Sequence, residues 1–200
     1  MGLIFNKDVF EVKNSNSHDV FITGNNSNKR RNTRDQLVVT GLLDGDLIHI
    51  IVNHWPSRGA DETKRIAAAE VNNLIIDSLR NIHNNAKIIT MGDFNDDPFD
   101  KSIKKVLGAK KEIKNVGKND LYNPFEKILV EKGIGTNAYR DKWQLFDQII
   151  LSREFLKKDY QDYQLYKAGV FNKSFLINKK GKFKGYPDRS FSYGTFTGGY

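Results

Sequence analysis

The sequence of 200 residues contains no cysteine, which excludes disulfide bonds and thiolate metal sites. It also contains no apolar run that approaches the roughly 20 residues of a membrane-spanning helix. The first residues lack a basic stretch followed by a long apolar run, so no signal peptide is visible. A chain without cysteine suits any compartment, and cytoplasmic and secreted locations both stay open.

The composition indicates a globular protein. Hydrophobic residues make up 38% of the chain and aromatic residues 12%, which is enough apolar material for a substantial core. We therefore expect a single domain over residues 1–200. The formal net charge of +8 favours polyanionic partners such as nucleic acid, phospholipid head groups or phosphorylated small molecules. Most of the excess positive charge lies in the second half, in residues 101–118 and 153–189.

Short apolar runs predict strands in the first fifty residues. Residues 2–5 and 9–12 flank turn-forming residues and predict a hairpin. Residues 14–32 are polar, and we expect a loop there with one short strand. Residues 37–43 and 47–52 are strong strand candidates, and the Asp-Gly pair between them predicts a second hairpin.

The next segment predicts a strand–helix–strand crossover. Asp61 is a suitable cap for a helix whose apolar residues recur at helical spacing as far as Ile82. An apolar strand, residues 87–91, follows it. Because the two strands of such a unit run parallel, His54 after the first and Asp93 after the second should lie at one edge of the sheet.

The second half predicts shorter elements. One strand, residues 143–151, contains Asp147 among apolar residues, and a buried carboxylate there needs a cation or hydrogen-bond donors. Asp147 is therefore either a second carboxylate beside a site or a structural residue. The remaining expectations are a short helix over residues 101–108, a basic loop over 110–118, a helix over 121–133 opened by Asn123-Pro124, a basic and aromatic region without a clear period over 153–185, and a loop over 190–196.

The stretch Gly92-Asp93-Phe94-Asn95-Asp96-Asp97-Pro98 carries the strongest chemical signal. Asp93 and Asn95 are two residues apart beyond a buried strand and point to the same side. Two hard oxygen donors in that position suit a magnesium-type ion or an activated water. Alone, the stretch also suits a polar turn, but the crossover that brings His54 beside Asp93 favours a site.

Three motifs in order resemble the endonuclease/exonuclease/phosphatase superfamily: Asn53-His54-Trp55-Pro56-Ser57, the Gly92–Pro98 stretch, and Phe146-Asp147-Gln148-Ile149-Ile150. The run from Gly135 to Gln148 is most similar to bacterial members, and the resemblance extends from about Gly2 to Tyr200. It implies an α/β fold of the deoxyribonuclease-I type, a two-sheet β-sandwich flanked by helices. It also implies divalent-metal hydrolysis of phosphodiesters or phosphomonoesters at one edge.

The resemblance also implies roles for single residues. Asp93 would orient and deprotonate the attacking water, and Asn95 would help to hold it and the phosphate. His54 would contact the phosphate or protonate the leaving oxygen. Asp147 would hydrogen-bond a catalytic histidine and hold its tautomer.

Phosphate and metal ligands follow from the same resemblance. Arg34 matches a phosphate-facing arginine before a strand, and a guanidinium suits phosphate oxygens. Weaker phosphate candidates are Asn53, Arg58 and Thr136. The expected ion is Mg²⁺, with Mn²⁺ or Ca²⁺ as alternatives, and Asp93 and Asn95 would be its ligands.

Two parts of the superfamily pattern are absent from the sequence: an early Asn-Glu motif whose glutamate binds the metal, and a terminal Ser-Asp-His motif. We therefore expect a chain that is incomplete at both termini, and one that has little or no hydrolase activity alone. The alternative is a catalytically inert member whose basic face binds nucleic acid or anionic lipid. The substrate and the oligomeric state stay open, because one fold serves many substrates.

Overall fold

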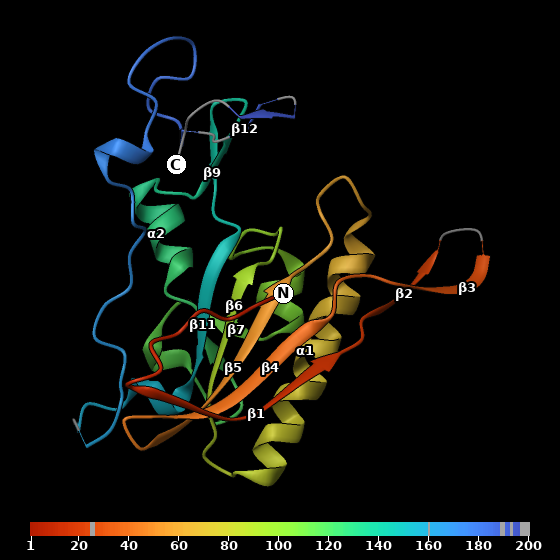
Figure 1. Cartoon of the computed structure of the whole chain (residues 1–200), viewed down its shortest axis with the longest axis vertical. Helices are drawn as coiled ribbons and strands as arrows, with labels where there is room; N and C mark the ends of the chain where they lie inside the picture. Colours follow the sequence, from red (N-terminus) through yellow and green to blue (C-terminus); the bar gives the residue numbers. More distant parts are fainter. Residues whose placement is uncertain (25–26, 160, 189–190, 193, 197–200) are drawn as a thin grey trace.

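A computed structural model describes residues 1–24, 27–159, 161–188, 191–192 and 194–196. Its centre is a seven-stranded mixed sheet, shown in Figure 1. The strands, in spatial order, are β1 (Phe10–His18), β4 (Gln36–Leu43), β5 (Asp46–His54), β6 (Lys87–Asp93), β11 (Asp147–Ser152), β8 (Leu121–Tyr122) and β7 (Ala109–Lys110). The pairs β5–β6 and β7–β8 are parallel and the other neighbours are antiparallel. The expected mixed α/β class is confirmed.

Short elements complete the described chain. Three two-stranded sheets pair β2 (Phe21–Gly24) with β3 (Ser27–Asn32), β9 (Asn137–Tyr139) with β10 (Lys142–Gln144), and β12 (Phe191–Ser192) with β13 (Thr195–Phe196). The α-helices are α1 (Glu62–Ile82) and α2 (Phe125–Lys132). A π-helical turn spans Ser102–Val106, and 3₁₀ turns span Ile113–Asn115, Arg153–Leu156 and Ser174–Leu176. No helix of the described residues is long and apolar enough to span a bilayer.

The predicted crossover is confirmed. The Asp61 carboxylate caps α1 by accepting a hydrogen bond from the Thr63 N–H at 2.9 Å. One side of α1 packs its buried alanines and isoleucines against the sheet, where they meet Val38, Ile51, Ile88 and Ile150 in the largest core cluster. The strands on either side of α1 are parallel, so both chain segments reach the same edge of the sheet.

The predicted hairpin of β4 and β5 is also confirmed. Asp44 and Gly45 both have positive φ, 46° and 90°, the conformation that a tight two-residue hairpin turn requires. Aspartate tolerates this region and glycine adopts it without a steric penalty.

The expected hairpin of residues 2–5 and 9–12 is wrong. Residues 2–5 form no strand, and the N–H groups of Val9 and Phe10 both donate to the Asn6 carbonyl, which makes a helical-type turn. The chain instead enters β1 at Phe10 and pairs with β4, with Phe10 opposite Leu43. The long β4 edge offers eight paired positions, more than the 2–5 run can supply.

The expected loop over residues 14–32 is largely wrong as well. Residues 14–18 continue β1, and β2 and β3 form a hairpin beyond it. β1 is an edge strand whose residues after Phe10 are exposed. Because backbone hydrogen bonds hold it to β4, its side chains need not alternate between apolar and polar, and the sequence shows no strand pattern there.

The second half differs from expectation in its boundaries. The helix predicted from residue 121 begins at Phe125, because Leu121 and Tyr122 form β8 and the Asn123 side chain accepts from the Phe125 N–H at 2.9 Å. The 101–108 helix is a π-helical turn, and the 110–118 loop begins in β7 and contains a 3₁₀ turn. Asp147 is not buried inside a strand but is the exposed first residue of β11. Ser190 and Tyr193 of the expected 190–196 loop lie outside the described residues.

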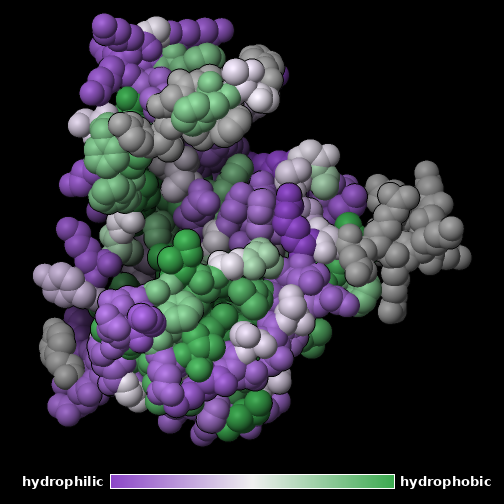
Figure 2. Space-filling view, viewed as in Figure 1, coloured by the Kyte–Doolittle hydropathy of each residue, from purple (hydrophilic) through white to green (hydrophobic). Residues whose placement is uncertain are grey.

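The second face of the sheet is only partly covered. Ile48 and Leu151, which point away from α1, pack with Phe155 in a smaller cluster, with Ile50 and Ile89 half-buried beside it. Ile149 on the same face is 45% exposed. Figure 2 shows hydrophobic side chains gathered over the middle of the sheet, with hydrophilic ones around them.

A candidate active site at the carboxyl edge of β5 and β6

His54 and Asp93 lie side by side at the end of the parallel pair. They are the last residues of β5 and β6 and occupy the same register position. His54 Nε2 lies 3.6 Å from Asp93 Oδ2. Both side chains remain accessible, at 42% and 35% exposure. The structure therefore brings together the two residues that the crossover was expected to bring together.

The backbone around Asp93 is fixed from both sides. Gly92 has φ of 133°, and a Cβ at this position would lie 2.1 Å from the Asn53 carbonyl oxygen, so only glycine fits. The Asp93 carbonyl accepts from the Trp55 N–H at 2.9 Å, and its carboxylate Oδ1 accepts from the Asn95 N–H at 2.9 Å. These contacts aim the second carboxylate oxygen at His54.

The environment makes Asp93 a stronger base than an ordinary aspartate. Burial raises the pKa of its carboxyl group, and the nearby negative charge of Asp147 raises that pKa further. The hydrogen bond from Asn95 and the charges of His54 and Arg34 act in the opposite direction. The net shift is upward.

Asn95 is held in a left-handed backbone conformation, with φ of 51°. Its Nδ2 donates to the Trp55 carbonyl at 2.9 Å, which leaves Oδ1 as the end that can meet a ligand. Phe94 between the two site residues is fully buried, with its ring edge-on to Trp55 at a centroid distance of 4.7 Å, and its N–H donates to Phe146. A buried aromatic anchor thus holds two polar side chains at the surface.

Asp147 faces Asp93 across the antiparallel pair β6–β11. The histidine from which Asp147 was expected to accept a hydrogen bond belongs to the motif that the sequence lacks, so this role stays a prediction; His54 faces Asp93. What Asp147 supplies is charge, since it lifts the pKa of Asp93.

Arg34 lies near the same edge. It and His54 line a cleft of about 490 Å³, together with Ser17, Thr33, Asp35, Leu37 and Met1. Arg34 Nη1 lies 3.4 Å from the Trp55 carbonyl, and its charge lowers the pKa of Asp93. The placement is compatible with the phosphate-facing role expected from the sequence.

Of the other phosphate candidates, Arg58 and Asn53 have protein partners, and Arg58 Nε also donates to the Asn95 carbonyl at 3.2 Å. Arg58 ion-pairs with Asp97 at 3.0 Å and with Asp100, and its guanidinium lies 4.7 Å from the centre of the Phe146 ring. Asn53 is 3% exposed, and its amide bonds Thr90, Asn72 and the Trp55 indole within the core. Thr136 donates its N–H to the Gln144 carbonyl, and its buried hydroxyl has no hydrogen-bond partner among the described residues.

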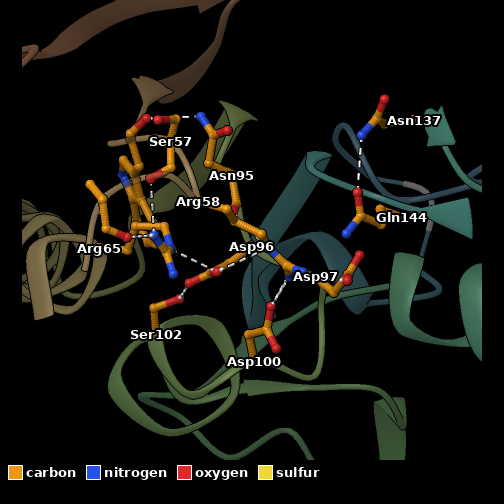
Figure 3. A network of polar contacts seen from close by, with 12 residues as sticks. Ser57, Arg58, Arg65, Asn95, Asp96, Asp97, Asp100, Ser102, Asn137 and Gln144 are labelled. Atoms are coloured by element: carbon orange, nitrogen blue, oxygen red, sulfur yellow. Dashed lines mark hydrogen bonds and ion pairs between the residues drawn. The ribbon is translucent and has the colours of Figure 1, made fainter. Parts of the chain in front are cut away.

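Sequence reasoning missed an ion-pair network directly behind the site, shown in Figure 3. Arg65 Nε donates to Asp96 Oδ1 at 2.7 Å, and Ser102 donates to Asp96 Oδ2 at 2.6 Å. Asp97 accepts from Arg58 and from the Leu145 N–H. Burial is the main cause that raises the pKa of both carboxyl groups. The Asp-Asp-Pro sequence after Asn95 was the available signal.

The described residues fit a hydrated cation better than a protein-caged one. No group of three or more His, Asp or Glu side chains in the described part of the chain is arranged to hold a metal ion. Asp93, Asp147 and the Asn95 amide oxygen do gather at one edge. Mg²⁺ keeps several waters and is often held by one or two carboxylates plus substrate phosphate oxygens. This donor set meets that smaller demand.

Comparisons with known proteins agree with this architecture. The model of the endonuclease/exonuclease/phosphatase family matches residues 1–200. A truncated TDP2 from Caenorhabditis elegans superposes with a TM-score of 0.50 at 14% identity, covering 72% of this chain and 54% of that one. An endonuclease/exonuclease/phosphatase family protein from Bacteroides thetaiotaomicron gives 0.50 at 17% identity, covering 74% and 52%.

These likenesses confirm the deoxyribonuclease-I-like fold expected from the sequence. The chain spans about half the length of the structures it matches. A search of curated protein sequences gave no match.

Proposed function

The chain belongs to the endonuclease/exonuclease/phosphatase family, and we propose that its site takes part in metal-dependent phosphoester hydrolysis. The observation that carries the proposal is the convergence of His54 and Asp93 at one register position, with Nε2 and Oδ2 3.6 Å apart. Asp147 and Asn95 lie at the same edge. Family members are hydrolases of phosphoesters, which is the chemistry that these groups suit.

In the proposed mechanism Asp93 accepts the proton of the attacking water. Without a bound ion the pKa of its carboxyl group is raised, which moves it toward the working pH at which a base is most effective. The Asn95 amide oxygen orients the same water. His54 contacts the phosphate or donates to the leaving oxygen, and Arg34 pairs with a second phosphate oxygen from the shared cleft.

A magnesium ion would be held by Asp93, Asp147 and Asn95, with water and substrate oxygens completing its coordination. When bound it would neutralise charge on the phosphoryl group and lower the pKa of a bound water. Mn²⁺ suits the same oxygen ligands and would be a substitute, whereas Ca²⁺ takes more oxygen ligands than this small donor set provides.

The alternative is a binding protein without catalysis. One observation favours it: the described residues contain no cluster of three or more acidic or histidine ligands. Turnover of a phosphoester substrate would distinguish the enzyme from the binding protein.

The test is hydrolysis of bis(p-nitrophenyl) phosphate and of p-nitrophenyl phosphate, with and without Mg²⁺, by the complete product of the reading frame that contains these 200 residues. Asp93→Asn and His54→Ala should each lower kcat by a factor of about 10² to 10⁴. Asp77→Asn, an exposed carboxylate on α1, is the matched control and should retain activity. No turnover with any divalent ion, or an unchanged rate for Asp93→Asn, would refute the proposal.

A further inference from the structure

A basic and aromatic lobe, defined as residues 166–186, stands apart in charge from the rest of the chain. It contains no aspartate or glutamate, and its six lysines are exposed. They are Lys167, Lys173, Lys179, Lys180, Lys182 and Lys184. None of them forms an ion pair with a carboxylate of the described residues, so their charge is available to an anionic partner.

Exposed aromatic rings lie between these lysines. Tyr166 is 96% exposed, Phe171 69% and Phe183 55%. Lys173 lies 5.8 Å from the centre of the Phe171 ring, and Lys182 lies at the same distance from Phe183. Lysine ammonium groups among exposed aromatic rings are the combination that binds single-stranded nucleic acid, with lysines on the phosphates and rings under the bases.

The lobe is attached to the chain segment that leads into the site. The Tyr186 hydroxyl accepts from the Asp141 N–H at 2.9 Å, and its ring lies 6.1 Å from that of Trp143 in β10. Directly after β10, the Leu145 N–H donates to Asp97 at 2.7 Å. Figure 1 shows the lobe, in blue, at the same end of the molecule as the β9–β10 hairpin.

We propose that the lobe binds a single strand of nucleic acid and presents its phosphodiester backbone to the site at Asp93. Tyr166, Phe171 and Phe183 stack on bases, and the lysines pair with phosphates. The role of the strand as a substrate rests on the proposed function, whereas its binding by the lobe is independent of that function.

The lobe favours a single strand over two other polyanions. The bases of a duplex are stacked inside it and cannot meet the rings, and the lobe has only one 3₁₀ turn, Ser174–Leu176, to offer a groove. A membrane surface is usually bound by an amphipathic helix, and the described residues of the lobe form none.

The lysines are tested by fluorescence anisotropy with a labelled 20-nucleotide oligothymidine. The test variant is Lys179→Ala/Lys180→Ala/Lys182→Ala/Lys184→Ala. We expect at least a tenfold loss of affinity and a smaller salt dependence, because each lost phosphate contact lowers the slope of log K against log salt by about 0.7. The matched control removes four exposed lysines elsewhere, Lys101, Lys105, Lys114 and Lys118, and should lose less than about threefold.

The rings are tested separately. Tyr166→Ser/Phe171→Ser should lose at least about tenfold in affinity with an unchanged salt slope, since stacking is not ionic. Leu74→Ser, which also removes an exposed apolar side chain (69% exposed), should bind as wild type. Circular dichroism of each variant establishes that it is folded.

The outcomes separate the two proposals. Equal or tighter binding of a duplex, or of phosphatidylserine vesicles, would overturn the single-strand assignment, and so would lobe variants that bind like the control. Asp77→Asn, an exposed carboxylate on α1, should bind the oligonucleotide as wild type does. A protein that binds the strand through the lobe but never hydrolyses it would refute the proposed function and leave the lobe proposal standing.

Discussion

Removal of Arg65 should destabilise the protein strongly, because it leaves a buried charge without its main partner. The Arg65 and Asp96 side chains are 7% and 3% exposed and 2.7 Å apart. Arg65 also donates to the carbonyls of Ser57 and Ala60 at 3.2 Å each, so it connects α1 to the loop before it. Breaking one partner of a buried pair typically costs about 3–5 kcal/mol.

The loss of unfolding free energy expected for removal of Arg65 lies at the lower end of that range. Asp96 keeps Ser102 at 2.6 Å, and Arg58 Nε lies 3.7 Å from its carboxylate. We therefore expect Arg65→Met to lose about 3 kcal/mol of unfolding free energy. For a chain of this size the loss corresponds to a fall in Tm of roughly 6–12 °C.

Urea unfolding followed by tryptophan fluorescence measures this loss directly. Trp55 is 2% exposed and packs on Phe94 beside the network, so its emission reports local order. Arg153→Met removes an exposed arginine and is the control. The double variant Arg65→Met/Asp96→Leu removes the stranded carboxylate and should recover part of the loss. A loss below about 1 kcal/mol for Arg65→Met would show that the pair is not a stabilising link.

Three further predictions concern other positions. Burial and the charge of His83 lower the pKa of His49 from 6.5 to about 4, so His49 contributes stability that is complete above pH 6.5 and is lost as the pH falls toward 4. The difference between the unfolding free energies at pH 7.5 and pH 4.5 should therefore be smaller in His49→Gln than in wild type by about 2.5 kcal/mol. An equal difference in both proteins would contradict the assignment. Gly92→Ala should lose at least about 2 kcal/mol of unfolding free energy in the same assay, because its Cβ would overlap the Asn53 carbonyl. The control Gly59→Ala, where the nearest atom lies 3.7 Å from the added Cβ, should leave the unfolding free energy unchanged. Asp61→Ala should lower Tm by the equivalent of about 1 kcal/mol through loss of the α1 cap, and an unchanged Tm would rule out that contribution.

The sequence was sufficient wherever local pattern and local chemistry agreed. The Asp44-Gly45 turn, the Asp61 cap and the helical spacing of α1 are each visible within a few residues, and together they fix the parallel crossover. The crossover in turn places His54 beside Asp93. These two site residues were therefore predictable without the structure.

The missed features depend on contacts that no local pattern records. The residues of β1 after Phe10 are held by backbone pairing with β4, and an exposed edge strand needs no apolar alternation. The ion pair of Arg65 with Asp96 joins residues 31 positions apart, and that of Arg58 with Asp100 joins residues 42 positions apart. Asp147 was expected inside a strand because apolar residues lie on both sides of it, and the sequence does not show that pairing with β6 begins at this residue.

The position of Asp93 depends on three separate anchors, and this links stability to chemistry. Gly92 lies against Asn53 of β5, Phe94 donates to Phe146, and the residues that follow Asn95 are tied to Arg58 and Arg65. A base that must be held within a fraction of an ångström depends on such support. Loss of an anchor should therefore lower unfolding free energy and kcat together. Loss of a lobe lysine should weaken oligonucleotide binding and leave both unchanged, because the six lysines are exposed, whereas the lobe meets the body of the protein through Tyr186, Ala168 and Val170. Measuring stability, turnover and binding on the same set of variants would thus distinguish support of the site from recruitment of its substrate.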